Sequence, residues 1–249
     1  MITTKQSPHG TNRKTAISVG VLFIIATVLN VLGKNIYQPI LDAPDYLIKI
    51  SANENQVIIG GLLVLLSAFA SAGIAFGLYP ALKKHHEALA LGSVGLRVME
   101  GMLYIVGVVG LLSLLTLSQK YVEAGASNAS LFQASGTILL AIKTWACQLA
   151  VIAFTLGILM YYYVFYQSKL IPRWLSGWGL IAAASSLAAA VLVIFGQLAS
   201  FSTVFLILQF PILLQEMVLA VWLIVKGFNP SAIASLSAKT ATNELLSTV

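Results

Sequence analysis

Six apolar segments, each long enough to cross a lipid bilayer, constrain the fold of this chain more than any other feature. A hydrocarbon core about 30 Å thick requires roughly 20 helical residues. Backbone polar groups in lipid must find hydrogen-bond partners within the chain, and an α-helix provides them inside one segment. We therefore expect an all-α membrane protein, a six-transmembrane-helix bundle. Its spans are expected at residues 15–33, 56–79, 89–117, 134–166, 174–197 and 202–225.

The composition supports this class and argues against others. Charged residues make up 9% of the chain, whereas a soluble domain contains about 25%. The formal net charge is +6, but the basic residues are scattered at the ends of apolar segments, so a nucleic acid is not an expected partner. Cys147 is the single cysteine, and no histidine lies within a predicted span. The lipid bilayer is therefore the expected partner, and neither a metal nor a cofactor is expected.

The distribution of Lys and Arg predicts the orientation, because the cytoplasmic flanks of membrane spans are enriched in both. Nine basic residues fall on the side of the two termini and three on the opposite side, which predicts cytoplasmic termini. The expected organisation is a cytoplasmic N-terminal tail at 1–14, a six-helix transmembrane domain at 15–228 and a flexible cytoplasmic tail at 229–249. The nine are Lys5, Arg13, Lys14, Lys83, Lys84, Lys169, Arg173, Lys226 and Lys239, and the three are Lys34, Lys49 and Lys120.

The polar segment between the first two spans, residues 34–56, is predicted to contain a short helix. Asp42 can act as its N-cap, with Pro44 and Asp45 in the first turn. Such a helix either lies in the membrane interface or covers the outer mouth of the bundle.

Aromatic residues gather near the predicted cytoplasmic ends of the last three spans. Tyr and Trp rings prefer the headgroup level of a bilayer, so we interpret these residues as an aromatic belt. They are Tyr161, Tyr162, Tyr163, Tyr166, Trp174, Trp178 and Trp222.

Four ionisable residues lie deep within three of the predicted spans. Arg97 and Glu100 in the third span are spaced i, i+3, which puts both side chains on one helix face. Lys143 in the fourth span and Glu216 in the sixth are expected at a similar depth, near the membrane midplane. A charge facing lipid costs about 3 kcal/mol or more, so we predict that these three spans face one another. The candidate binding or coupling residues are Arg97, Glu100, Lys143, Gln148, Gln209, Gln215 and Glu216.

Three functions are compatible with this cluster. The first is transport of a small polar solute, an ion or a proton through Arg97, Glu100 and Glu216. The second is a structural, sensory or immunity-type protein whose ion pairs only fix the arrangement of the helices. The third is an intramembrane enzyme, although no catalytic motif is found and no catalytic residue is assigned. A cavity that reaches Arg97 and Glu216 would favour transport, and a closed core would favour the structural role.

Several ordered segments carry a family resemblance. They are LYPALKKHHEALALGSVGLRVMEG, IPRWLSGWG and LQEMVLAVWLIVKGF, together with ILDAPDYLIKISANENQVIIGGLL between the first two spans. In this combination the chain resembles a bacterial integral-membrane family known only as a domain of unknown function. The resemblance implies a six-span protein of the bacterial inner (cytoplasmic) membrane. It implies no activity, so no catalytic residue follows from it.

Overall fold

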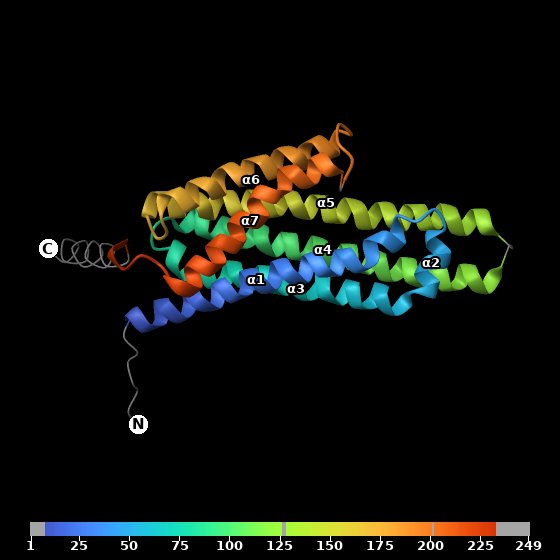
Figure 1. The fold of residues 1–249 in the computed structure, drawn as a ribbon, viewed down its shortest axis with the longest axis horizontal. Helices are drawn as coiled ribbons and strands as arrows, with labels where there is room; N and C mark the ends of the chain where they lie inside the picture. The colour runs from blue at the N-terminus through green and yellow to red at the C-terminus, as the bar shows by residue number, and fades with distance from the viewer. Residues whose placement is uncertain (1–7, 126–127, 201, 233–249) are drawn as a thin grey trace, which may run out of the picture.

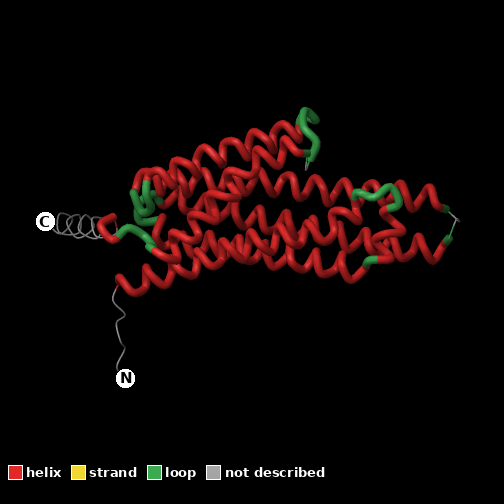
Figure 2. Tube along the Cα trace, in the orientation of Figure 1, coloured by secondary structure: helices red, strands yellow, loops and turns green. Residues whose placement is uncertain are grey.

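The computed structural model describes residues 8–125, 128–200 and 202–232, which form helices joined by short turns (Figures 1 and 2). Six of these helices are long and apolar enough to cross a membrane. The predicted all-α bundle of six transmembrane helices is confirmed, and the chain is a multi-pass membrane protein. The helices are α1 (Pro8–Leu41), α2 (Tyr46–Ala52), α3 (Glu54–Leu82), α4 (Glu87–Ala124), α5 (Ala129–Ser168), α6 (Arg173–Ile194) and α7 (Thr203–Val225).

The start of α1 and the end of α7 lie at the same end of the bundle (Figure 1). We call this the terminal end and the opposite one the distal end. That the terminal end faces the cytoplasm stays a prediction from the positions of Lys and Arg. Of the two expected tails, residues 1–7 and 233–249 lie outside the described residues.

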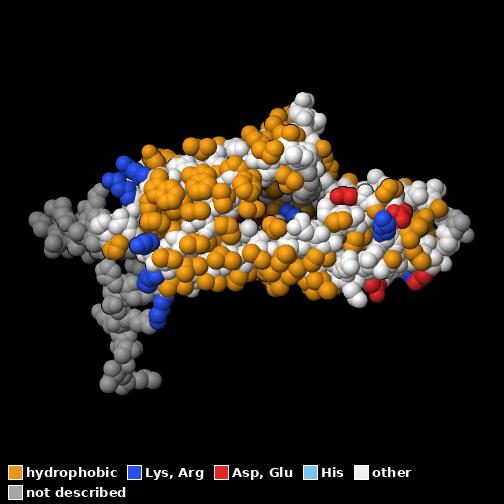
Figure 3. All heavy atoms as spheres, in the orientation of Figure 1, with side chains coloured by type: hydrophobic (Ala, Val, Ile, Leu, Met, Phe, Trp, Pro, Cys, Tyr) orange, Lys and Arg blue, Asp and Glu red, His pale blue; other side chains and the backbone are white. Residues whose placement is uncertain are grey.

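The helices α4 and α5 project beyond α6 and α7 at the distal end (Figure 1). They contain 38 and 40 residues, whereas α6 and α7 contain 22 and 23. At about 1.5 Å per residue, α5 is roughly 60 Å long and α6 roughly 33 Å. Hydrophobic side chains cover the face where α6 and α7 are present, and the acidic side chains visible on this face gather on the projection (Figure 3). We infer that the projection lies outside the hydrocarbon core.

The segment between the first two spans differs from the expectation. The helix α1 continues to Leu41. The short helix α2 begins only after it, at Tyr46, with Asp45 at its N-cap. The expected N-cap, Asp42, instead continues the last turn of α1, because its backbone N–H donates to the Gln38 carbonyl at 3.0 Å. The short helix was predicted correctly, but its start and the end of the first span were not.

The helix α2 packs against α4 within the projection. It buries Leu47 and Ile50, which are 4% and 0% exposed, in the distal part of the core. This contact makes α2 a structural element of the projection rather than a loosely attached helix.

The aromatic residues at the end of α5 divide between the surface and the core. Tyr163 and Tyr166 are exposed, as an aromatic belt requires, whereas Tyr161 and Tyr162 are 1% and 0% exposed. Each residue of an α-helix is rotated by about 100° from the one before, so four neighbouring tyrosines cannot share one face. The interpretation as a belt was therefore wrong for Tyr161 and Tyr162.

Glycines allow α1 and α3 to approach closely. A Cβ atom on Gly60 would lie 2.8 Å from the carbonyl oxygen of Gly33, and a Cβ atom on Gly33 would lie 2.6 Å from the carbonyl oxygen of Gly60. Small residues at such crossings let backbones pack where lipid provides no hydrophobic drive. The resulting α1–α3 pair forms one wall of the cavity described below.

We expect Gly60→Ala to destabilise the protein by about 1–3 kcal/mol, because the added methyl group overpacks the crossing. The measurement is the thermal unfolding midpoint of the purified protein in detergent. Gly95→Ala is the matched control, since a Cβ atom on Gly95 meets no atom within 4 Å. Equal midpoints for the two variants would contradict this account of the α1–α3 contact.

The terminal half of the bundle is filled by large apolar and aromatic side chains. One core contains Leu78 and Leu82 of α3 together with Leu219 and Leu223 of α7, and all four are 0% exposed. The rings of Tyr161, Tyr162 and Phe165 pack against one another in the same core. This packing closes the interior of the bundle at the terminal end.

The helix α7 crosses the bundle diagonally (Figure 1). At the terminal end it lies against α1, where the Arg13 guanidinium donates to the carbonyl of Ile224 at 2.8 Å. Towards the distal end it lies against α6, where the Ser185 hydroxyl donates to the carbonyl of Leu208 at 3.1 Å. The two helices α1 and α7 therefore diverge towards the distal end.

Candidate functional site

A cavity of about 380 Å³ occupies the space where α1 and α7 diverge. We call it the midbundle cavity. Figure 3 shows a hollow on this face beside the distal ends of α6 and α7, with a basic side chain inside it. The midbundle cavity lies between α1 and α7, next to the packed core of the terminal half. Its polar lining consists of Thr27, Asn30, Lys34, Asn35, Gln38, Ser67, Ser71, Arg97, Glu100, Tyr104, Thr144, Cys147, Gln148, Ser200, Gln209 and Glu216.

Arg97 and Glu100 form an ion pair on the cavity wall, as their spacing predicts. Arg97 Nη1 lies 3.0 Å from Glu100 Oε2, and the two residues are 2% and 5% exposed. The Ser71 hydroxyl of α3 donates to the same carboxylate oxygen at 2.9 Å. The Arg97 guanidinium also lies over the Phe154 ring, 4.9 Å from its centroid. These contacts come from α3, α4 and α5 and fix both charged groups.

Several hydrogen-bond donors in the cavity are unused. Within the described part of the chain, Nε and Nη1 of Arg97 and Nε2 of Gln209 form no hydrogen bond. Arg97 Nη1 and Glu100 Oε2 are close to each other, but the N–H bonds of Nη1 are not directed at that oxygen. The contact is therefore an ion pair without a hydrogen bond. A buried donor without a partner costs about 1–3 kcal/mol. All three nitrogen atoms are themselves buried, so a bound molecule could accept a hydrogen bond from them only after these side chains shift.

Glu216 presents its carboxylate to the midbundle cavity from α7. Its Oε1 accepts a hydrogen bond from the Tyr161 hydroxyl at the long distance of 3.5 Å. Arg97 and Glu100 are the charged groups that act on Glu216, yet no ion pair within 4 Å joins Glu216 to a described residue. Three of the four predicted charges, one positive and two negative, therefore line the same cavity.

Gln215, the neighbour of Glu216, faces away from the cavity. Its Oε1 accepts a hydrogen bond from the Tyr162 hydroxyl, and its Nε2 donates to the Leu175 carbonyl at 3.1 Å. It is 0% exposed and fixes α7 against α5 and α6. Gln215 therefore does not line the cavity, and its hydrogen bonds hold α7 in position.

The other two predicted glutamines line the cavity. Gln148 Nε2 donates to the Ala190 carbonyl of α6 at 3.2 Å. Gln209 Oε1 accepts a hydrogen bond from the Ser186 hydroxyl, which leaves its amide nitrogen free for other partners.

Lys143 does not join the cluster. Its Nζ donates to Gln38 Oε1 at 2.9 Å and lies 4.7 Å from the centroid of the Tyr37 ring. The backbone of Lys143 packs against Gly110 of α4. Gly110 follows Arg97 by 13 residues, so it lies about 20 Å closer to the distal end than Arg97 does. The expected depth was wrong because the fourth span was assumed to start at the membrane surface, whereas α5 starts on the projection.

Lys34, which was predicted to lie in the polar segment after the first span, is a cavity residue. It lines the midbundle cavity from α1, and its Nζ lies 4.9 Å from the centroid of the Tyr104 ring. Within the described residues no carboxylate oxygen lies within 4 Å of it. The apolar spacing of Tyr37, Ile40 and Leu41, all buried, could have indicated that the first helix continues through Lys34.

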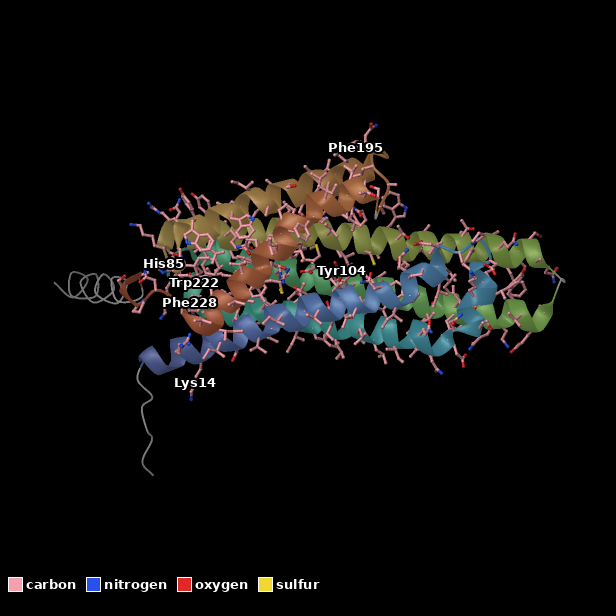
Figure 4. The ribbon with its side chains drawn as sticks, viewed as in Figure 1. Lys14, His85, Tyr104, Phe195, Trp222 and Phe228 are labelled. Carbon is pink, nitrogen blue, oxygen red and sulfur yellow. The ribbon has the colours of Figure 1, made fainter. Side chains whose placement is uncertain are left out.

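The labelled view places Tyr104 near the middle of the molecule, well separated from Trp222 and Phe228 at the terminal end (Figure 4).

The described residues contain no group of three or more His, Cys, Asp and Glu side chains placed to hold a metal ion. The cavity is thus a set of hydrogen-bond donors, acceptors and opposite charges in an otherwise apolar bundle. Such a set can bind a polar solute or exchange a proton.

A family model described as "Domain of unknown function (DUF4386)" matches residues 18–227. The matched range contains every polar residue of the midbundle cavity. No curated protein and no solved structure matches the chain.

Proposed function

We propose a function from the midbundle cavity alone, because the chain belongs to the family described as domain of unknown function (DUF4386), which carries no assigned activity. The protein binds a small polar solute in this cavity and transports it across the bacterial inner membrane. Glu216 binds the proton or the cationic group that is coupled to transport. The observation that supports this proposal is a cavity with a polar lining that contains Arg97, Glu100 and Glu216, beside a terminal half packed with apolar and aromatic side chains.

The solute class follows from the groups left free in the cavity. Arg97 Nε and Gln209 Nε2 are unused donors, and Lys34 adds a positive charge towards the distal side. Glu216 is an acceptor with one long hydrogen bond. A zwitterion places an anionic group near the donors and a cationic group near Glu216. The volume of about 380 Å³ lies within the range of about 300–1,000 Å³ that is usual for small-molecule sites.

Transport additionally requires that the closed terminal end opens. In many transporters a site near the membrane midplane is reached alternately from the two sides. The Tyr161 hydroxyl contacts Glu216 and its ring belongs to the packing that closes the terminal half. Binding at Glu216 is therefore directly coupled to the side chains that would have to move.

The structural alternative is weaker than the sequence suggested. Arg97 and Glu100 lie on the same helix, so their ion pair cannot by itself hold two helices together. The bond from Ser71 to Glu100 does join α3 to α4. Those two helices also pack along much of their length without it.

Thiol labelling tests whether the midbundle cavity is open on one side. In a Cys147→Ala background, we expect Thr27→Cys to react with a membrane-impermeant methanethiosulfonate added to the distal side, which is the outside of spheroplasts in the predicted orientation. Thr155→Cys is the matched control, because Thr155 is 0% exposed and does not line the cavity. We expect Thr27→Cys to react faster by on the order of tenfold or more.

Inverted membrane vesicles expose the terminal side, and there we expect neither cysteine to react. Equal labelling of the two variants from the distal side would contradict an open cavity and favour the structural role.

A further inference from the structure

A second hollow lies at the terminal end, away from the midbundle cavity. It is a groove of about 620 Å³ between the α5–α6 turn and the chain that follows α7. We call it the terminal groove. It is lined by residues 169–173, by Trp222 and by residues 226–230.

Three cations and no carboxylate line the terminal groove. They are Lys169 of the α5–α6 turn, Arg173 at the start of α6 and Lys226 after α7. None of the three forms an ion pair with an acidic residue in the part of the chain that the structure describes. Arg173 instead lies over the Tyr166 ring, 5.4 Å from its centroid. Like charges repel one another, so their convergence favours the binding of an anion between them.

The groove is a fixed structure rather than a chance meeting of loops. The Asn229 backbone N–H donates to the Leu170 carbonyl at 2.8 Å, and the Asn229 side-chain amide donates to the Lys169 carbonyl at 3.3 Å. The Phe228 ring packs near the Phe165 ring, with 6.3 Å between their centroids. These contacts join the two walls of the groove.

Lys169 occupies a backbone conformation that glycine adopts more easily. Its φ is 56°, in the left-handed region, at the position just after α5 ends. Helices very often end with glycine in this conformation, because a side chain is strained there. A lysine at this place keeps a cation at the groove in spite of the strain, which suggests a role for its charge.

The aromatic side chains beside the terminal groove are of the kind expected at the depth of lipid headgroups. The rings of Trp174 and Trp222 meet edge to face beside it, with 6.4 Å between their centroids. Trp rings prefer the headgroup level, and basic pockets at the cytoplasmic ends of membrane helices bind anionic headgroups. From the terminal end, the apolar surfaces of α6 and α7 continue towards the distal end, where acyl chains would lie (Figure 3).

We infer that the terminal groove binds the phosphate of an anionic phospholipid through Lys169, Arg173 and Lys226. Free phosphate has the same charge chemistry, but the neighbouring Trp residues and the apolar helix surfaces favour a lipid. This site is independent of the proposed transport function and of the midbundle cavity.

The test measures phosphatidylglycerol bound to the full-length protein by native mass spectrometry, with phosphatidylcholine as the neutral lipid. We expect Lys169→Gly and Lys226→Gln each to weaken phosphatidylglycerol binding by about fivefold, which is the usual effect of one cation near a membrane surface. Lys84→Gln is the matched control, because Lys84 is an exposed lysine of the terminal end that does not line the groove. We expect this variant to bind as the unaltered protein does.

Lys169→Gly separates the lipid site from a structural role. Glycine relieves the backbone strain, so in phosphatidylcholine the thermal midpoint is expected to rise while phosphatidylglycerol binding falls. If Lys84→Gln weakens binding as much as Lys169→Gly, the effect is general surface charge and the inference is wrong. Inorganic phosphate is the second probe. If it raises the thermal midpoint in phosphatidylcholine as much as phosphatidylglycerol does, the groove is a site for free phosphate, and the lipid assignment is overturned.

Discussion

Glu216→Gln is expected to fold at the normal level and to lose transport completely. Glu216 forms no ion pair within 4 Å with a described residue, and Arg97 keeps Glu100 as its partner when Glu216 is neutral. No unpaired charge is therefore created, and removal of a desolvated charge is neutral or stabilising. The amide cannot exchange a proton or neutralise a cationic group. Transport should fall to background while the thermal midpoint stays equal or rises.

The assay uses proteoliposomes that contain a pH-sensitive dye. The twenty amino acids, added as a mixture, serve as the zwitterionic probe, with choline and acetate as singly charged controls. Proton movement that depends on the mixture is expected for the unaltered protein and not for Glu216→Gln. The matched control is Glu87→Gln, which makes the same chemical change at an exposed residue in the first turn of α4. A Glu216→Gln variant that moves protons at the normal rate would refute the coupling role.

The sequence predicted the charge cluster in part, and the reasons are physical. The pairing of Arg97 with Glu100 follows from helix geometry, which is local. The approach of Glu216, from more than 100 residues away, follows from the energy of a charge in lipid, which holds for any arrangement of helices. Neither argument depends on the details of helix packing.

The positions of Lys143 and Lys34 required information that the sequence does not contain locally. The depth of Lys143 depends on how far α5 extends beyond α6 and α7, two helices that come later in the chain. Lys34 was assigned to a loop because charged and polar residues follow the apolar run, although the helix continues to Leu41. A hydropathy pattern indicates which residues contact lipid. It does not indicate where a helix ends once that helix has left the membrane.

Tyr161 shows a related limit. Tyrosine occurs both in interfacial belts and as a buried hydrogen-bond donor. Neighbouring tyrosines are distinguished only by the helix face on which each one lies. Its contact with Glu216 became visible once α5 and α7 were placed relative to each other. The same placement revealed the midbundle cavity, whose walls come from five helices.

Arg97→Gln is expected to have the largest effect on folding. It leaves Glu100 and Glu216 as two buried carboxylates without the nearby cation, and breaking a buried ion pair costs about 3–5 kcal/mol. Much less folded protein should be recovered, as measured by size-exclusion chromatography in detergent. The double variant Arg97→Gln, Glu100→Gln removes both charges of the pair, so folding should largely return.

The double variant separates the two roles of the cluster, because it restores charge balance without restoring Arg97. If Arg97 only balances Glu100, the refolded double variant should also regain proton movement in the proteoliposome assay. If Arg97 binds the anionic group of a solute, as its unused Nε donor suggests, folding returns and transport does not. A glutamine has no cation to attract that group, and the Ser71 hydroxyl can still bond the neutral residue at position 100. Recovered folding with recovered transport would therefore make the ion pair structural and would assign coupling to Glu216 alone.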